Sequence, residues 1–249
     1  MNDKYIEIRR YDQRALQILN CKTLSKKKIK DYINLPYQYY FSFIKKLKKN
    51  KLLEIGAGTG ENTLRLIKMK FNVCATDISP KSVEVMSQKY SKYKNFFSKV
   101  ADMEKLPFKN ESFDVICSAG SLSYGDNNRV MNEIYRVLKF GGSAVFVDSL
   151  NNNPIYRFNR YINYIKGDRS LSTLKRMPNV NLINKYIKKF GYGKVRFFGS
   201  ITWAFPLLKI VLAEKVITKI SNWADQILNL KKSAFKFVLI LVKKNIITN

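Results

Sequence analysis

The stretch LLEIGAGTGENT, residues 52–63, constrains the fold of this chain more than any other feature. Its glycines, Gly56, Gly58 and Gly60, stand at every second position between an apolar run and a helix-like segment. A loop of this composition joins a buried strand to a helix and exposes backbone amides at the helix N-terminus. The stretch therefore predicts a ligand that approaches bare main chain closely.

Two common ligands of glycine loops do not fit this one. A P-loop for nucleoside triphosphates continues with Lys and Ser or Thr after its last glycine, whereas Glu61 and Asn62 follow here. The dinucleotide fingerprint places its third glycine three positions after the second, whereas only Thr59 separates Gly58 from Gly60. The glycines alone leave the ligand open.

Short apolar runs alternate with helical patterns from Lys51 to Leu150. This alternation implies right-handed crossovers and a parallel sheet, whose ligands bind beyond the carboxyl ends of the strands. Ser79 should cap one helix, with Pro80 in its first turn, and Gly141–Gly142 should end another. We expect strands at 51–55, 72–77, 95–102, 112–120 and 143–150, and helices at 61–70, 79–93 and 128–139.

The flanking segments have a different pattern. Residues after Asn151 contain several arginines and prolines, which is typical of a loop-and-helix insertion. We expect helices at 4–20, 26–49 and 181–191, the last closed by Gly191, a helical segment at 203–230, and strands at 194–202 and 234–244.

Composition narrows the chemistry. The chain has 249 residues and no histidine, and its three cysteines, Cys21, Cys74 and Cys117, are far apart. A zinc site or a disulfide framework is therefore not indicated, and Cys74 and Cys117 are expected to be buried strand residues. The N-terminus lacks an apolar leader, and no run reaches the roughly 18 apolar residues of a membrane span, so a cytoplasmic protein is expected.

The net charge of +28 is unevenly distributed. Residues 51–150 carry 14 basic and 11 acidic side chains, whereas residues 151–249 carry 19 and 3. Such asymmetry indicates an anionic partner, which is a nucleic acid, a membrane surface or a phosphorylated substrate. A chain rich in Lys, Asn and Ile is also typical of an AT-rich genome, and both interpretations stay open.

Acidic residues follow the glycine loop at the ends of successive predicted strands. Glu54 lies two residues before Gly56, where a carboxylate can hold a cationic amino group through loop amides or water. Asp77 ends the second strand, where an acid can accept both hydroxyls of a ribose. Asp102 and Met103 end the third, where a carboxylate can accept an adenine amino group and a thioether can pack on its ring. Amino acid, ribose and adenine in that order describe S-adenosylmethionine.

The chain resembles the class I S-adenosylmethionine-dependent methyltransferases of the UbiE-like, or methyltransferase type 11, group. The resemblance covers about residues 51–150 and rests on LLEIGAGTGENT, ATDISP, ADMEKLPFKNESFDVICSAGSLSYGD and NEIYRVLKFGGSAVFVD. It implies an α/β, Rossmann-like sheet of seven mostly parallel strands with helices on both faces and the last strand antiparallel. It also implies S-adenosylmethionine as cofactor, S-adenosylhomocysteine as product, and no metal. The expected cofactor residues are Glu54, Gly56, Ala57, Gly58, Gly60, Asp77, Ile78, Asp102, Met103 and Ser118.

The loop after the fourth strand bears on the acceptor. It reads SAGSLSY and lacks the Asn/Asp-Pro-Pro-aromatic motif of enzymes that methylate amines of nucleic-acid bases. Many relatives carry Leu-His where this chain has Leu122-Ser123, so any role of that histidine is lost. Cys117 belongs to an apolar strand, and the spacing of Asp114, Asp126 and Asp148 does not indicate a magnesium site.

A hydroxyl oxygen of a small anionic molecule remains, and such a nucleophile benefits from a general base. Without histidine, the candidate catalytic residues are Tyr124, Asp126 and Asp148, although Asp126 is also a plausible helix N-cap. The insertion NPIYRFNRYINYIKGDRSLSTLKRMP resembles a variant found among bacterial surface-polysaccharide and capsule genes. Its arginines match phosphate oxygens bidentately, and the expected substrate-binding residues are Arg157, Arg160, Arg169 and Arg176.

The sequence thus predicts one methyltransferase domain over 1–249, with a helical cap (1–50), a cofactor-binding core (51–150) and a substrate-side insertion with a C-terminal strand hairpin (151–249). The favoured reaction is O-methylation of a sugar, nucleotide sugar or phosphorylated small molecule for a bacterial surface polysaccharide. Alternatives are RNA methylation, which the missing base-binding loop disfavours, a quinone or lipid-linked acceptor, and a catalytically silent cofactor-binding protein. Segment 203–230 is expected to pack in the core or a homodimer, or to contact a membrane peripherally; a monomer is equally compatible.

Overall fold

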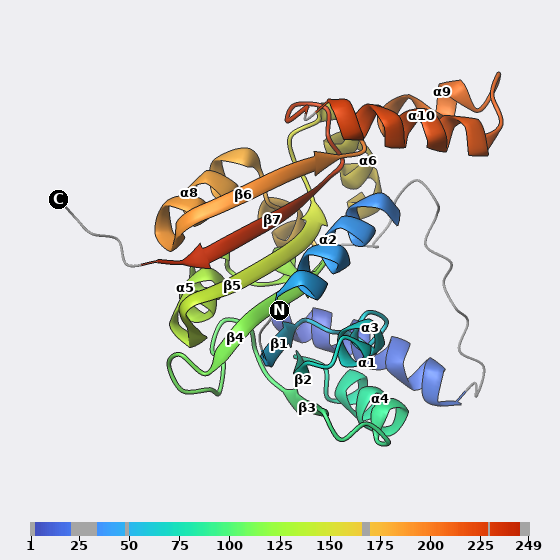
Figure 1. Cartoon of the computed structure of the whole chain (residues 1–249). Helices are drawn as coiled ribbons and strands as arrows, with labels where there is room; N and C mark the ends of the chain where they lie inside the picture. The colour runs from blue at the N-terminus through green and yellow to red at the C-terminus, as the bar shows by residue number, and fades with distance from the viewer. Residues whose placement is uncertain (1–2, 21–33, 48–49, 166–169, 229, 245–249) are drawn as a thin grey trace.

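The computed structural model describes residues 3–20, 34–47, 50–165, 170–228 and 230–244 (Figure 1). Its centre is a seven-stranded sheet in the order β3-β2-β1-β4-β5-β7-β6. Only β7 runs antiparallel to its neighbours, β5 and β6, which confirms the predicted fold. The strands are β1 (Lys51–Ile55), β2 (Asn72–Asp77), β3 (Phe96–Val100), β4 (Phe113–Ala119), β5 (Leu138–Ser149), β6 (Gly191–Phe198) and β7 (Lys236–Lys243).

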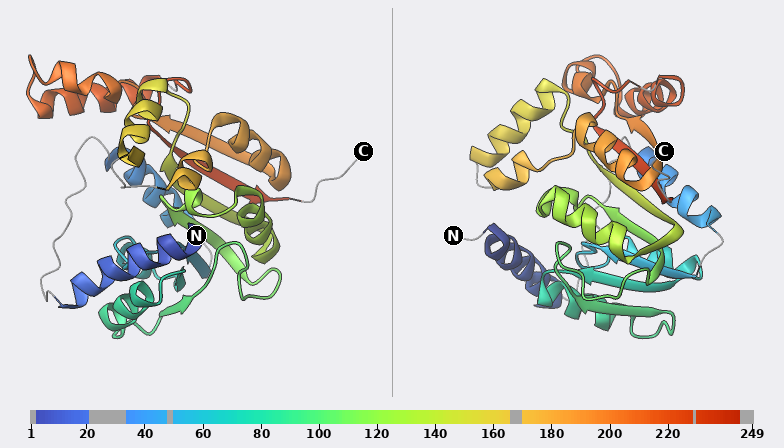
Figure 2. Two further views of the ribbon diagram at one scale, coloured as in Figure 1. Left: turned by 180° about the vertical axis from the view of Figure 1, so that it is seen from behind. Right: turned by 90° about the vertical axis from the view of Figure 1, so that its left-hand side faces the viewer.

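Helices cover both faces of this sheet (Figures 1 and 2). The helices α2 (Asn34–Lys46), α3 (Thr63–Lys68) and α4 (Pro80–Tyr90) pack on one face, and α5 (Asn127–Val137) and α8 (Val180–Phe190) on the other. Successive side chains of a strand point to opposite faces, so Phe146 of β5 enters the core under α5 and α8 while Val145 and Val147 enter the other. A strand buried on both faces reads as the near-continuous apolar run that the sequence shows.

Capping residues and glycines in the sequence correctly predicted several helix boundaries. The Ser79 side chain accepts a hydrogen bond from the Ser82 amide, which caps α4 as predicted. Gly191 ends α8 with a φ of +79°, the left-handed conformation that favours glycine. The prediction for Gly141–Gly142 was wrong, because α5 already ends at Val137 and both glycines lie inside β5. Leu138 pairs with Phe113 in the sheet. The register shifts between this pair and the pair Val115–Ser143, and Gly141, with a φ of +68°, lies in that irregular part of the strand.

The helices expected at 4–20 and 181–191 are present as α1 (Asp3–Asn20) and α8, but the segment between β6 and β7 is not one continuous helix. Segment 203–230 was predicted as one helical stretch, but it is divided into η3 (Thr202–Ala204), α9 (Phe205–Leu208) and α10 (Glu214–Ile227). Of the helix expected over 26–49, residues 26–33 and 48–49 lie outside the described part of the chain, and residues 34–46 form α2. The remaining elements are η2 (Leu122–Tyr124), α6 (Pro154–Ile165) and α7 (Leu171–Lys175).

Candidate active site

The glycine loop connects β1 to α3 at the carboxyl edge of the sheet. Gly56, Gly58 and Gly60 all have positive φ angles, of +61°, +59° and +81°. At Gly56 the space is also closed, because an added Cβ would lie 2.4 Å from the Cβ of Ser121. The Ser121 hydroxyl donates to the Ile55 carbonyl (3.2 Å), so the loop after β4 touches the glycine loop directly. Both the backbone angle and the neighbouring loop after β4 therefore require glycine at position 56.

Glu54 lies inside β1 with its carboxyl group almost fully buried. It accepts a hydrogen bond from the Thr63 hydroxyl (2.6 Å), the first residue of α3. Burial raises the pKa of Glu54 to about 7, and the Thr63 hydrogen bond opposes that rise. A cationic group arriving at this carboxylate would restore its ionised form, since an opposite charge favours the charged state.

Asp77 links the end of β2 to the glycine loop. One carboxylate oxygen accepts from the Gly58 amide (2.8 Å) and the other from the Ser79 amide (3.0 Å). Burial raises the pKa of Asp77, while these amide hydrogen bonds lower it. Ile78 follows, half-buried, at the turn into α4. The carboxylate thus sits between two loops at the strand end, which is where the sequence placed a ribose acceptor.

Asp102 and Met103 lie past β3, next to the same loop. An added Cβ on Gly56 would come within 3.5 Å of the Met103 methyl group, so this side chain borders the glycine loop. Asp102 accepts from the Glu104 amide (2.9 Å) and from the Lys4 ammonium (2.6 Å). Ser118 is buried and lies one residue before the end of β4, with its hydroxyl hydrogen-bonded to that of Ser121.

Helix α1 lies along this edge and touches the candidate cofactor residues one after another. Asp12 accepts from the Ser79 hydroxyl (2.6 Å) and the Lys81 amide (3.1 Å) at the start of α4. Lys4 pairs with both Asp102 and Glu104. Further contacts join Arg14 to Glu61 (3.7 Å), Tyr11 to the Tyr124 ring, and Glu7 to Thr173 of α7. The helix therefore covers the site from the glycine loop to the insertion.

The three candidate bases lie in different surroundings. Asp126 caps α5, accepting from the amides of Asn128 and Arg129. The Tyr124 ring meets Tyr11 edge-on at 5.7 Å, and its hydroxyl is 3.5 Å from the Arg10 guanidinium. Asp148 is buried at the end of β5, and burial raises its pKa. It accepts from the Leu122 amide (2.9 Å) and the Ser149 amide (2.6 Å), which ties the loop after β4 to β5.

The candidate substrate arginines are not gathered in one place. Arg160 is buried, donating to the Leu150 carbonyl (2.8 Å) and the Asn151 side chain (3.2 Å). Arg157 is exposed on α6, and Arg176 is half-buried at the end of α7, where its carbonyl accepts from Asn127 (2.8 Å). Arg169 lies outside the described residues. Of the four candidate arginines, Arg157 and Arg176 are therefore the described ones whose positions leave them available to a phosphate group.

Several residues of the site could not be found from the sequence. Ser121 and Thr63 support the glycine loop and Glu54, and their only signal was proximity to the motifs. Lys4 and Asp12 reach the site from α1, across 98 and 67 residues of chain, and no local pattern pairs them with Asp102 or Ser79.

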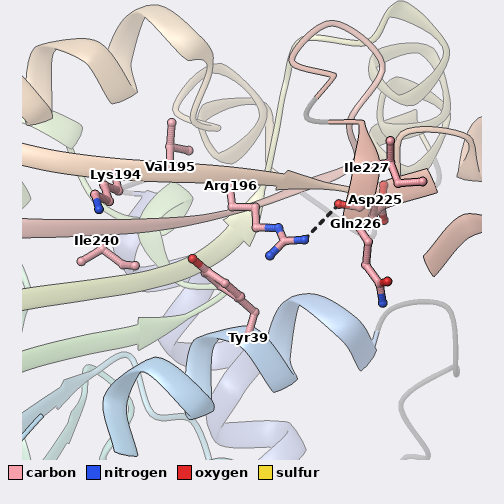
Figure 3. A pocket seen from close by; sticks show the side chains of 8 residues that line it. All are labelled: Tyr39, Lys194, Val195, Arg196, Asp225, Gln226, Ile227 and Ile240. Atoms are coloured by element: carbon pink, nitrogen blue, oxygen red, sulfur yellow. Dashed lines mark hydrogen bonds between the residues drawn. The ribbon is translucent and has the colours of Figure 1, made fainter. Parts of the chain in front are cut away.

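A hollow of about 400 Å³ lies elsewhere on the described surface (Figure 3). Tyr39, Arg196 and Gln226 line it between α2, β6 and α10, and Arg196 donates to the Asp225 carbonyl (3.2 Å). It contains none of the residues of the glycine-loop edge. Within the described residues, no cluster of three or more His, Cys, Asp or Glu side chains is arranged around a common point as metal ligands are.

The strand order and the glycine loop together define a doubly wound α/β protein of the methyltransferase type. Residues 53–146 match a family described as "Methyltransferase domain". The match runs from β1 into β5 and therefore includes the glycine loop, Asp77 and Asp102. The relatives agree with this class, although the matches cover only part of each chain.

The chain is 34% identical over 117 residues to 2-methyl-6-phytyl-1,4-hydroquinone methyltransferase 2 of Oryza sativa, covering 46% of this chain and 33% of the rice protein. It is 28% identical over 166 residues to demethylmenaquinone methyltransferase of Chlorobaculum parvum, covering 59% and 68%. The fold is similar to phosphoethanolamine N-methyltransferase 2 of Haemonchus contortus, solved with phosphomonomethylethanolamine and S-adenosylhomocysteine. That likeness has a TM-score of 0.59 at 18% identity, and it covers 84% of this chain and 53% of the other.

The buried carboxyl of Glu54 predicts a pH dependence of stability. In the folded protein Glu54 keeps its proton up to about pH 7, whereas its ordinary pKa is 4.5. Between these values the folded state binds more protons than the unfolded state, so the free energy of unfolding falls as pH rises through this window. Each unit of difference in pKa corresponds to about 1.4 kcal/mol, which makes ~3.5 kcal/mol an upper bound for the fall in the free energy of unfolding.

Glu54→Gln should remove this part of the pH dependence. Denaturant unfolding of the ligand-free protein at about pH 5.5 and pH 8 should show a smaller difference in the variant than in the wild type. Asp77 and Asp148 also have raised pKa values, so the comparison between the two proteins is the informative quantity. Parallel curves for wild type and Glu54→Gln would show that Glu54 ionises normally.

Proposed function

We propose that this chain transfers a methyl group from S-adenosylmethionine to an oxygen of a small molecule. One observation carries the proposal: Glu54, the glycine loop, Asp77 and Asp102 with Met103 lie in sequence order along one edge of the sheet. Glu54 would hold the amino group of the cofactor, Asp77 the ribose hydroxyls, and Asp102 and Met103 the adenine. Bound there, the cofactor supplies an electrophilic methyl group, and the chain supplies alignment with the acceptor.

The acceptor that we favour is a hydroxyl of a sugar, nucleotide sugar or phosphorylated small molecule in surface-polysaccharide synthesis, in the cytoplasm. The cover provided by α1 supports a small acceptor over a base within RNA, because Asp12, Lys4 and Tyr11 occupy the edge beside the cofactor residues. Arg157 and Arg176 are the arginines that would meet a phosphate. Tyr124 and Asp148 are the bases that we favour. Burial raises the pKa of Asp148, which makes its carboxylate a stronger proton acceptor, whereas Asp126 serves as the N-cap of α5.

A quinone or another lipid-linked acceptor is the second candidate. The similar proteins from Oryza sativa and Chlorobaculum parvum are named for hydroquinone and menaquinone precursors, which supports an acceptor with an isoprenoid tail. The insertion helix α6 also exposes Ile155, Phe158 and Ile165, side chains that suit an apolar tail better than a nucleotide sugar.

Methyl transfer from labelled S-adenosylmethionine separates these acceptors. The panel contains nucleotide sugars, lipid-linked saccharides, a hydroquinone and total RNA, each at low and moderate salt. We expect label in a saccharide hydroxyl, at least tenfold above the signal without acceptor. Label in the hydroquinone would select the second candidate. Label in RNA that falls steeply with salt would reject both, because phosphate contacts are salt-dependent.

A further inference from the structure

Helices α9 and α10 form an arm at the edge of the molecule. They follow β6 and precede β7 in the chain, and Figures 1 and 2 show them projecting beyond the end of the sheet. One face of α10 attaches the arm, through buried Ile217, Ser221 and Ala224. Asp225 adds hydrogen bonds from the amides of Gly199 (2.6 Å) and Ser200 (3.0 Å) at the end of β6. The arm is therefore held firmly by one side only.

A second apolar stripe runs along α10 and is not covered by the rest of the described chain. Val216, Ile220, Trp223 and Ile227 follow one another at spacings of four, three and four residues, which places them on one side of the helix. Trp223 is 62% exposed and Ile227 61%. The α9 end of the arm exposes three more apolar side chains, Leu207, Ile210 and Val211, by 67%, 80% and 82%. Large apolar side chains exposed together on one element indicate a binding surface.

The charges beside this outer face are almost all positive. Residues 207–232 contain five lysines, at 209, 215, 219, 231 and 232, against Glu214 and the buried Asp225. Glu214 is already paired with Lys209 (3.1 Å). An apolar stripe that contains a tryptophan and is flanked by lysines is typical of a helix that lies in a membrane interface. A second copy of this chain is a poor partner, because each carries a net charge of +28.

The arm leaves the sheet at the same edge as the candidate active site. Because β5 and β6 are both antiparallel to β7, they run in the same direction, and their carboxyl ends lie at one edge. The arm follows β6 there, and Asp148 and the loop after β4 lie at the ends of β5 and β4. A membrane contacted by the arm would therefore face the side of the sheet where the acceptor is expected.

We propose that the outer face of α9 and α10 binds the surface of an anionic lipid bilayer, from which the enzyme takes an amphiphilic acceptor. The contact is peripheral, since no helix within the described residues has the length and apolar character needed to cross a bilayer. The membrane contact is inferred from the arm alone, whereas the acceptor is inferred from the proposed function. A lipid-linked saccharide and an isoprenoid quinone are both amphiphilic acceptors that a membrane-bound enzyme could take from the bilayer.

Vesicle binding of the full chain tests the proposal. Vesicles of phosphatidylcholine with about 30% phosphatidylglycerol should bind the wild type, and Trp223→Ala should weaken binding ~10-fold. The matched control is Phe97→Ala on β3, which removes a similarly exposed aromatic ring (58%) far from the arm and should bind as the wild type does. In a Trp203→Phe background, the fluorescence of Trp223 should shift to the blue on vesicle addition.

A second pair of variants distinguishes binding through the arm from attraction of the whole basic protein to an anionic surface. Lys215→Gln/Lys219→Gln should weaken binding ~10-fold or more, whereas Lys188→Gln/Lys189→Gln on α8 loses the same charge and should have a much smaller effect. Equal losses in the two pairs, no fluorescence shift, or dimerisation abolished by Trp223→Ala would overturn the proposal. S-adenosylhomocysteine affinity and methyl transfer, measured without vesicles, report on the proposed function independently, because the arm contains none of its cofactor residues.

Discussion

Gly56→Ala should abolish measurable binding of S-adenosylhomocysteine, a loss of at least ~100-fold. The new Cβ would lie 2.4 Å from the Ser121 Cβ and 2.5 Å from its hydroxyl oxygen, and φ at this position is +61°. Ser121 is held by the Ile55 carbonyl and by Ser118, so the glycine loop has to move away from the loop after β4. A displacement of about 1 Å at a positioning loop is enough to cost two orders of magnitude.

Gly141→Ala is the matched control for this variant. Gly141 also has a positive φ (+68°), but an added Cβ there meets open space, and the residue is exposed at the start of β5. It should lose ~1–2 kcal/mol of stability from backbone strain and keep wild-type affinity. Isothermal titration calorimetry and thermal melting measure both quantities. Wild-type affinity in Gly56→Ala would show that the loop does not contact the ligand.

Asp77→Asn should weaken S-adenosylhomocysteine binding by ~100-fold while leaving the fold intact. The carboxylate accepts from the Gly58 and Ser79 amides, and an asparagine amide can accept with only one of its two polar atoms. One loop amide is then left without its partner, and one acceptor for a ribose hydroxyl is lost. Burial raises the pKa of Asp77, so the ionised carboxylate is costly in the folded protein. The neutral asparagine removes this cost, which offsets the lost hydrogen bond, and the melting temperature should change little.

Asp114→Asn provides the comparison. Asp114 also accepts from a backbone amide, that of Lys51 (2.9 Å), and from the Lys139 ammonium (2.9 Å), but at the opposite end of β1. Its substitution should lower stability slightly and leave affinity unchanged. Calorimetric titration of both variants decides the matter: if Asp77→Asn binds as well as Asp114→Asn does, the ribose role of Asp77 is rejected.

Much of the fold was predictable because the signals for it are local. The Ser79 cap depends on residues three positions apart, and Gly191 ends α8 through its own backbone angle. Where tertiary pairing competed with a local signal, the prediction failed. Gly141–Gly142 read as a helix terminator, but pairing of Leu138 with Phe113 ended the helix earlier and placed both glycines in β5.

The candidate cofactor residues could be placed from the sequence because of sheet geometry. Parallel strands bring their carboxyl ends to one edge, so Glu54, Asp77 and Asp102, each near the end of its strand, had to lie close together. The roles of these residues stay predictions for the experiments above. Their positions followed from chain order and the right-handed crossover alone.

Only the tertiary structure decided what surrounds that edge. The pairing of Lys4 with Asp102 joins segments with no shared local pattern, and the inward turn of Arg160 toward the Leu150 carbonyl removes it from an arginine group that looked uniform in sequence. The same holds for Trp223 and Ile227, which periodicity alone cannot distinguish from core residues. Sequence determined the strand ends and their chemistry because these depend on neighbouring residues, whereas exposure and long-range pairing depend on how distant segments pack.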